Sequence, residues 1–460
     1  MAESPSTRGA EPSNAATQAS SAKYDSRLQR DWNPDRREAF PCTPSDLSLV
    51  DENLEPRTAR KWLKVLGGFF VTTATFGVIN SIGLLLTHLE KNQLKSYSPK
   101  DIAWIAAANI FLAYSVPVLT GPIYDRYGPR WLLIFGTLCF TTGLLVMSFF
   151  ASDDDPFRVF AMLMASWGLL CGVGTGAACT AITGTIYHTF NERRGLACGL
   201  VFTGCSLGGV VWPLMLRETL DRWGWACALR VLAGIVFVLL GMGYFLIQGG
   251  YEGTKNGPIV SFRCFRKMPF VFLTASLAVF QFVATSVVAT LPGWGLNMGF
   301  NQNMMFYIIS TLNAGAAVGR VTIGLLSDSS VGRINSVLLL ETLAVVVIFG
   351  LFLNIGNSTA MFYAFASLWG FSAGAILSMM SVLVGQVCKK SDFGMYYGTN
   401  SLMISLAGLM CVPLGKLMMV SFGTTAYVAL LGGLSALGVV LMGVARWAYL
   451  DFVWGWKKEV

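Results

Sequence analysis

The chain has 460 residues, of which 54% are hydrophobic and only 13% are charged, and its mean hydropathy is +0.58. Soluble domains carry about 25% charged residues, so this composition excludes a soluble protein and predicts a polytopic membrane protein. The net charge of +8 does not indicate nucleic-acid binding, because the basic residues form short clusters at the ends of apolar segments.

The first 60 residues are rich in Ser, Pro, Ala and Asn and contain almost no aliphatic segment. Such a composition cannot bury enough apolar surface to fold, so we expect residues 1–60 to be a disordered tail. The tail also lacks the short apolar core and small-residue cleavage site of a secretory signal peptide. We therefore expect the first apolar segment to act as the membrane-targeting anchor.

Apolar segments of membrane-spanning length recur from the tail to the end of the chain. A helix needs about 20 apolar residues to cross a bilayer, whereas a barrel strand would show alternation. We expect twelve spans, near residues 64–88, 102–120, 131–150, 158–186, 196–216, 227–248, 269–291, 303–326, 335–354, 361–386, 396–417 and 425–447. The predicted fold is all-α, with two pseudo-symmetric six-helix bundles (61–248 and 269–450), a linker (249–268) and a short C-terminus (451–460).

Basic residues are distributed unevenly between the two sides that twelve spans define. They are enriched about two to one in the segment before the first span, in the linker and in the loops on the same side. The positive-inside rule makes that side cytosolic. We therefore predict a multi-pass protein, most simply of the plasma membrane, with both termini in the cytosol.

The loop between the second and third spans has the sequence Gly-Pro-Ile-Tyr-Asp-Arg-Tyr-Gly-Pro-Arg, residues 121–130. Asp125 can accept hydrogen bonds from a helix N-terminus, and Gly128 can adopt a positive φ. Arg126 and Arg130 are expected at the cytosolic surface. An ordinary polar loop is the alternative interpretation. We predict that these residues belong to a gate.

Residues 324–333 repeat the order of glycine, aspartate and arginine, with Asp328 and Arg333 in the corresponding places. The copy lies between the eighth and ninth spans, so it indicates a duplicated half. A second correspondence joins residues 191–199 to residues 389–398, where charges that include Arg193 and Arg194 precede a Gly-x-x-x-Gly helix start. Such glycines let helix backbones approach closely, which suits bundles that move against each other as well as static packing.

This combination of twelve spans, two halves and a Gly-x-x-x-Asp-Arg-x-Gly-x-Arg loop resembles the major facilitator superfamily over about residues 60–450. Three stretches are similar to the fungal branch of its monocarboxylate porter family: residues 76–83, residues 190–197 with 204–209, and residues 317–320. The resemblance implies alternating access and transport of small carboxylates with a proton. It also implies that helices one, four, seven and ten line the pore.

The family resemblance implies a lysine in the first span and an Asp-x-x-x-Arg pair in the eighth. Arg320 matches the arginine, but Ala316 occupies the aspartate position, and the first span contains no lysine between Lys64 and Lys91. The fungal branch is similar to carriers of diverse organic solutes, including vitamins and exported metabolites. The sequence therefore favours a departure from simple lactate-like substrates.

Arg320 and Glu341 are the candidates for functional charges buried inside predicted spans. An arginine within a membrane is costly unless it faces water, a partner or an anion, so Arg320 either binds substrate in a central cavity or pairs with Asp328 near the end of its span. Glu341, about a turn inside the ninth span, is either a coupling group that titrates or a snorkelling or gate-pairing side chain.

Neutral polar residues within spans form a second set of candidates for substrate binding. They are Asn80, Tyr114, Gln281, Asn313 and Asn400. Each can instead form an interhelical hydrogen bond that holds a bundle together.

We therefore predict a secondary active transporter of small organic solutes, carboxylate-bearing and exported as a fungal secondary metabolite. The alternatives are an uptake carrier for a monocarboxylate or vitamin, and a non-transporting sensor of the same fold. We find no sequence pattern for an enzyme, metal site or cofactor. The expected partners are an organic anion, with or without a coupled proton, and membrane lipid, and we expect a functional monomer.

Overall fold

The computed structural model describes residues 44–92, 94–150, 155–247, 262–356 and 358–452, and every regular element in these ranges is a helix. The chain divides into two units, residues 1–57 and 58–460. In the first unit, residues 44–57 are helical and form the start of α2 (Pro44–Ala74). Helix therefore extends into the segment predicted as a disordered tail. Its first residue is Pro44, followed by Asp46, and both residue types are favourable in the first turn of a helix.

The N-terminal half of the second unit contains the helices that correspond to the first six predicted spans. After α2 these are α3 (Phe76–Ile79), α4 (Ile82–Lys91), α5 (Pro99–Ser115), α6 (Pro117–Tyr127), α7 (Pro129–Phe150), α8 (Pro156–Leu163), the π-helix η1 (Met164–Cys171), α9 (Gly172–Thr189) and α10 (Arg194–Leu246).

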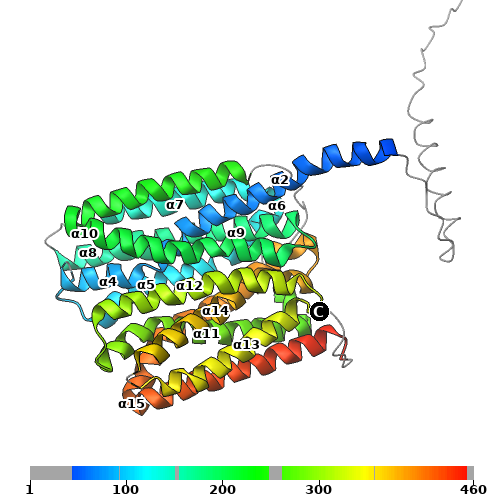
Figure 1. Ribbon diagram of the computed structural model, residues 1–460. Helices are drawn as coiled ribbons and strands as arrows, with labels where there is room; N and C mark the ends of the chain where they lie inside the picture. Colours follow the sequence, from blue (N-terminus) through cyan, green and yellow to red (C-terminus); the bar gives the residue numbers. More distant parts are fainter. Residues whose placement is uncertain (1–43, 93, 151–154, 248–261, 357, 453–460) are drawn as a thin grey trace, which may run out of the picture. The chain divides into compact units, whose positions relative to one another are not determined.

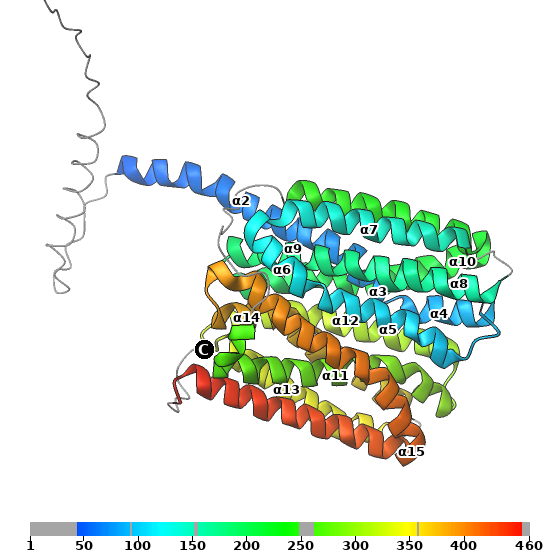
Figure 2. The same cartoon turned by 180° about the vertical axis from the view of Figure 1, so that it is seen from behind.

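The C-terminal half begins after the predicted linker, most of which lies outside the described residues. Its elements are η2 (Phe262–Arg266), α11 (Met268–Asn297), α12 (Gln302–Ser327), α13 (Arg333–Gly350), η3 (Phe352–Asn354), α14 (Thr359–Val387), η4 (Lys390–Asp392) and α15 (Phe393–Tyr449). Both views show the blue-to-green helices of the N-terminal half on one side and the yellow-green-to-red helices of the C-terminal half on the other (Figures 1 and 2).

Ten helices in the described part of the chain are long and apolar enough to cross a membrane. Two elements are too long for one crossing, because α10 has 53 residues and α15 has 57, or about 80 Å each at 1.5 Å per residue. Gly224 interrupts α10 and Gly423 interrupts α15 with non-helical backbone. These two reversals agree with twelve spans, a count that stays a prediction.

Four glycines mark chain reversals that have nearly the same backbone conformation. Gly128 (φ 76°, ψ −169°), Gly224 (74°, 177°), Gly332 (82°, 165°) and Gly423 (82°, 168°) all occupy a region accessible essentially to glycine alone. The positive φ predicted for Gly128 is thus confirmed. The four turns follow the second, fifth, eighth and eleventh predicted spans, so each half contains two related three-span units.

The two halves contact each other chiefly through three pairs of helices, with smaller contacts of α9 and α10 with α14 and of α9 with α15. Helices α5 and α6 pack on α15, and α10 packs on α12. Each pair joins a helix of one half to a helix of the other, and these contacts position the candidate site.

Candidate functional site

Asp125 caps a helix that belongs to the opposite half. It lies in the last turn of α6, is 7% exposed, and accepts hydrogen bonds from the backbone N–H of Gly394 (3.0 Å) and Met395 (3.2 Å). These are the first N–H groups of α15, which have no acceptor within their own helix. The partial positive charge of the helix N-terminus adds to the contact.

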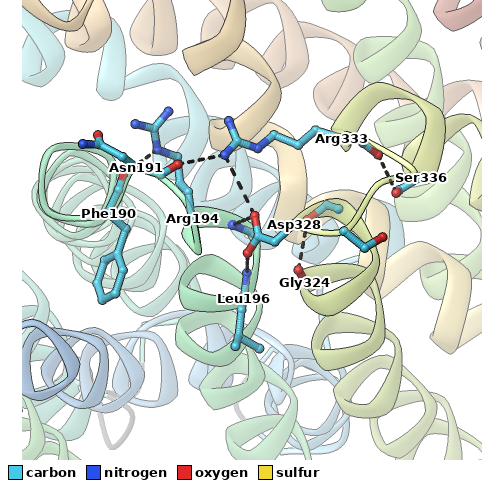
Figure 3. A network of polar contacts seen from close by, with 12 residues as sticks. Phe190, Asn191, Arg194, Leu196, Gly324, Asp328, Arg333 and Ser336 are labelled. Atoms are coloured by element: carbon cyan, nitrogen blue, oxygen red, sulfur yellow. Dashed lines mark hydrogen bonds and ion pairs between the residues drawn. The ribbon is translucent and has the colours of Figure 1, made fainter. Parts of the chain in front are cut away.

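Asp328 makes the same contact in the opposite sense. It directly follows α12 and accepts hydrogen bonds from the N–H of Gly195 (2.9 Å) and Leu196 (2.8 Å), in the first turn of α10. Figure 3 shows this carboxylate pointing at the backbone of α10, with Arg333 beside it. Each half thus supplies one carboxylate to a helix of the other, and we call these contacts the Asp125 latch and the Asp328 latch.

Both latches lie at the same end of the molecule. Asn191, in the loop before α10, accepts hydrogen bonds from Arg333 through its carbonyl oxygen (3.0 Å) and from Lys390 through Oδ1 (2.8 Å). Arg333 also lies 3.9 Å from Asp328 Oδ1. Because Lys390 shortly precedes Gly394, these contacts join the surroundings of one latch to those of the other.

Glycines allow the helices of each latch to touch through their backbones. A Cβ atom on Gly121 would lie 2.0 Å from the carbonyl oxygen of Gly394, and one on Gly199 would lie 2.2 Å from that of Arg320. No side chain fits at such distances, which explains the Gly-x-x-x-Gly starts of α10 and α15.

The other predicted gate residues have different environments. Arg193 and Arg130 are exposed, and Arg126 is half-buried. Arg194 is buried, donates from Nε to the carbonyl oxygen of Phe190 (2.9 Å), and lies 4.0 Å from the centre of the Tyr187 ring.

Tyr187, which sequence reasoning did not single out, adds a second contact between the halves at this end. Its ring stacks on Phe393 with centroids 3.9 Å apart, and its hydroxyl donates to the carbonyl oxygen of Gly385 (3.0 Å). Cys388 lies close to both Tyr187 and Asp125, and burial raises the pKa of its thiol to about 12. Cys388 is half-buried, so the accessibility of its thiol can be used as a probe at the latch end.

Arg320 lies inside α12, seven residues before its end, and is 8% exposed. Its guanidinium donates to Ser206 Oγ and lies 3.8 Å from Cys205 Sγ through the other terminal nitrogen. Its Nε has no hydrogen-bond partner among the described residues, and no ion pair to Arg320 is found there. The alternative interpretation, a pair with Asp328, is not observed, because Asp328 caps α10.

Asn80 and Asn313 meet across the two halves. Asn80 Nδ2 lies 3.5 Å from Asn313 Oδ1 and 3.3 Å from the carbonyl oxygen of Cys205. Asn313 Nδ2 in turn donates to the carbonyl oxygen of Gly209 (3.4 Å). With Arg320, these two asparagines form a polar centre that is built around α10.

Three further candidates lie in separate surroundings. Tyr114 of α5 is half-buried and close enough to Arg320 to feel its charge. Gln281 donates to Thr285 Oγ1 (2.9 Å), while its Oε1 has no partner among the described residues. Asn400 is fully buried, and neither of its amide atoms has a partner in that part of the chain. No contact of Gln281 or Asn400 with Arg320 is observed among the described residues.

Glu341 lies within the C-terminal half and away from the polar centre. It is 1% exposed and accepts a hydrogen bond from Ser276 Oγ (3.0 Å) of α11, while its Oε2 has no partner among the described residues. Ser276 Oγ is also 2.9 Å from the carbonyl oxygen of Gly438 in α15. This burial is unlike that of a snorkelling side chain, and the one hydrogen bond of Glu341 observed among the described residues is to its own half.

Comparison with known proteins identifies related sequences over most of the chain. A sequence model described as Major Facilitator Superfamily matches residues 65–353 and 309–451. The "Agnestins efflux protein AgnL12" of Paecilomyces divaricatus is 27% identical over 390 residues, which are 85% of this chain and 88% of that protein. The "Riboflavin transporter MCH5" of Saccharomyces cerevisiae is 27% identical over 424 residues, 86% of this chain and 80% of that protein.

A solved structure shares the fold. The crystal structure of the human organic anion transporter MFSD10 (TETRAN) matches with a TM-score of 0.66 and 16% sequence identity. The match covers 84% of this chain and 99% of that one.

Proposed function

Because the chain belongs to the Major Facilitator Superfamily, a class of transporters and not of enzymes, we propose that it is a secondary active transporter of small organic anions. Arg320 is the observation that carries the anionic part of the proposal. Its buried guanidinium has no carboxylate partner among the described residues, and its Nε has no hydrogen-bond partner there.

A guanidinium in a membrane span is costly to bury without an anion. Its planar donors match a carboxylate, and a contact in a water-poor site is stronger than one in bulk water. We propose that Arg320 binds the carboxylate, while Asn80 and Asn313 bind other polar groups of the same substrate. Tyr114, Gln281 and Asn400 are proposed as further binding residues.

Substrate binding at this place competes with contacts between the halves. Arg320 contacts Ser206, and Asn80 contacts Asn313, and each pair joins the N-terminal half to the C-terminal half. A carboxylate on Arg320 replaces the Ser206 contact. Binding therefore loosens the centre of the interface and allows the halves to rock.

We propose that the latch end faces the cytosol, so that the described state is closed to the cytosol and open outward. The cluster of Arg130, Arg193, Lys389 and Lys390 at this end supports the orientation. Cytosolic termini follow from the same orientation, and we propose the plasma membrane as the location. Asp125, Asp328, Arg126, Arg194 and Arg333 act in the gate under this proposal.

The direction that we propose is export, since related fungal proteins include efflux proteins. Uptake of a monocarboxylate or vitamin is the second candidate, since a related yeast protein is named a transporter of the vitamin riboflavin. For coupling we propose a proton carried by Glu341, because one of its carboxylate oxygens is free of partners among the described residues.

Transport by the purified full-length chain in liposomes tests the anionic proposal, with labelled lactate and labelled phenyllactate as probes. Losing charge-assisted hydrogen bonds costs about 1.5–3 kcal/mol, so Arg320→Gln is expected to reduce counterflow of both acids about tenfold or more. Arg222→Gln, at an exposed position to which no role is assigned, is the matched control. Counterflow by Arg320→Gln equal to that of the unmodified protein would contradict the binding role.

A further inference from the structure

A small hydrophobic cluster lies beside Arg320 and is separate from the main core. Its buried members are Phe76, Ile79, Ala113, Cys179 and Cys205, and Ile110, Tyr114 and Phe202 pack against them. The cluster therefore draws on α3, α5, α9 and α10 of the N-terminal half. We call it the ring cluster.

Aromatic rings form one side of the ring cluster. The Phe76 ring lies 5.8 Å from that of Tyr114 and 6.4 Å from that of Phe202, with interplanar angles of 50° and 57°. Tilted rings at these separations are within the range of edge-to-face attraction, and a further ring placed against this surface gains the same attraction.

The partly exposed side chains of the cluster lie where several helices meet. Tyr114 is half-buried and packs against residues that include Cys179 of α9 and Cys205 of α10, and Arg320 of α12 is close enough to act on its phenol electrostatically. The phenol therefore lies on the side of α5 that faces other helices of the protein. Phe202 is also half-buried, and Phe76 keeps 9% exposure.

Arg320 connects the ring cluster to the polar centre. Its guanidinium lies 3.8 Å from the sulfur of Cys205, a member of the cluster, and contacts the next residue, Ser206. The positive charge thus lies at the edge of an apolar aromatic surface. A ligand that satisfies both must carry an anion beside a ring.

We propose that the ring cluster binds an aromatic or conjugated ring of the substrate while Arg320 binds the carboxylate of the same molecule. This inference rests on the proposed function and narrows the substrate class to ring-bearing organic acids. The edge of the bound ring contacts the faces of Phe76 and Phe202, and Tyr114 lies between the ring and the guanidinium. A saturated ring of the same size lacks the edge-to-face attraction, and a short aliphatic acid leaves the surface empty.

Binding measurements on the full-length protein in nanodiscs test this inference with four probes. Phenyllactate carries the ring and the acid, cyclohexyllactate has a saturated ring, lactate has no ring, and phenylpropanediol has the ring without the acid. The unmodified protein is expected to bind phenyllactate at least fivefold more tightly than cyclohexyllactate and more tightly still than lactate. The uncharged diol is expected to bind most weakly.

Two substitutions separate the ring contact from the charge contact. Phe202→Leu is expected to reduce the preference for phenyllactate over cyclohexyllactate about fivefold and to leave lactate binding unchanged. Arg320→Gln is expected to weaken all three acids by a similar factor. Phe245→Leu, at a ring that is 72% exposed, is the control and is expected to change nothing. If Phe202→Leu unfolds, Phe76→Leu makes the same test.

Each failure has its own signature. Equal affinity for phenyllactate and cyclohexyllactate in the unmodified protein would overturn the ring site while leaving the proposed anion site intact. Acid binding that is insensitive to Arg320→Gln would instead overturn the proposed function. No binding of any acid by the unmodified protein would overturn both.

Discussion

The two latches have the same geometry but are built from different surroundings. In each, a carboxylate accepts two backbone hydrogen bonds at the start of a helix from the other half, at 3.0 and 3.2 Å for Asp125 and at 2.9 and 2.8 Å for Asp328. Around Asp125 the glycine of the capped helix faces backbone, since a Cβ on Gly394 would lie 2.1 Å from the Gly121 carbonyl oxygen.

Around Asp328 the corresponding glycine faces a side chain. A Cβ on Gly195 would lie 1.9 Å from Ser327 Oγ and 3.0 Å from the nearest backbone oxygen, that of Gly324. Arg333 adds a charge 3.9 Å from Asp328 and a hydrogen bond to Asn191. Backbones meet closely at both latches, but the capped glycine itself faces backbone at the Asp125 latch and a side chain and an ion pair at the Asp328 latch.

The largest expected effect comes from adding a methyl group at the two glycines. Gly394→Ala places a carbon against backbone that cannot move aside, so we expect it to prevent closure and reduce transport more than tenfold. Gly195→Ala meets mainly Ser327 Oγ, and we expect the added substitution Ser327→Ala to restore much of its transport. Counterflow of phenyllactate measures both. If Ser327→Ala did not restore transport to Gly195→Ala, or if Gly394→Ala and Gly195→Ala lost transport equally, the proposed difference between the two latches would be contradicted.

The next largest effect comes from removing either carboxylate. Asp125→Ala and Asp328→Ala each lose two charge-assisted hydrogen bonds, a change of about 1.5–3 kcal/mol in the closed state. Opening exposes Cys388, and because burial is what raises its pKa to about 12, exposure lowers that pKa and speeds labelling by maleimide. Peptide-resolved mass spectrometry measures the labelling rate, which we expect to rise about tenfold. Asp101→Ala, at an exposed site, is the control, and an unchanged rate in both latch variants would refute the latching role.

A smaller effect tests the ion pair that accompanies the Asp328 latch. Arg333→Gln removes a partly exposed ion pair worth about 0.2–1 kcal/mol, so we expect Cys388 labelling to increase about twofold. Salt screens such pairs, and the difference between Arg333→Gln and the unmodified protein should therefore shrink between 50 mM and 500 mM NaCl. A difference that is independent of salt would argue against a charge contribution.

The smallest expected effect on closure comes from Glu341, which lies inside the C-terminal half. Glu341→Gln keeps an oxygen for the Ser276 hydrogen bond, so we expect an unchanged melting temperature and unchanged Cys388 labelling. Gradient-driven accumulation is expected to lose its dependence on the pH difference, while counterflow persists. A variant that still accumulates phenyllactate in response to a pH gradient would remove Glu341 from coupling.

Much of the architecture could be predicted from the sequence, because span length and loop motifs are local properties. Asp125, Gly128 and the repeated Asp328 loop were found from short patterns, and the structure gives them the helix-capping and positive-φ geometry that those patterns predict. The predicted end of the tail at residue 60 differs from the structure, because α2 already begins at Pro44.

The partners of the central residues could not be predicted, because they depend on how distant helices cross. Arg320 contacts Cys205 and Ser206, more than 100 positions earlier in the chain. The π-helix η1 and the ring of Tyr187 also left no distinctive pattern. The glycine-rich segment around Cys205 was the one available signal for this contact. It predicts that another helix backbone approaches closely, but it does not show which helix that is.

Distances between the ends of the two halves test the central claim most directly. Spin labels at Glu192→Cys and Lys389→Cys report on the latch end, and labels at Lys95→Cys and Asn301→Cys report on the opposite end, both in a cysteine-free background. Pulsed electron paramagnetic resonance is then recorded with and without phenyllactate, and in the Asp125→Ala/Asp328→Ala double variant. The account predicts that the latch-end distance lengthens as the opposite distance shortens. Distances that stay fixed, or that lengthen together, would contradict alternating opening around Arg320.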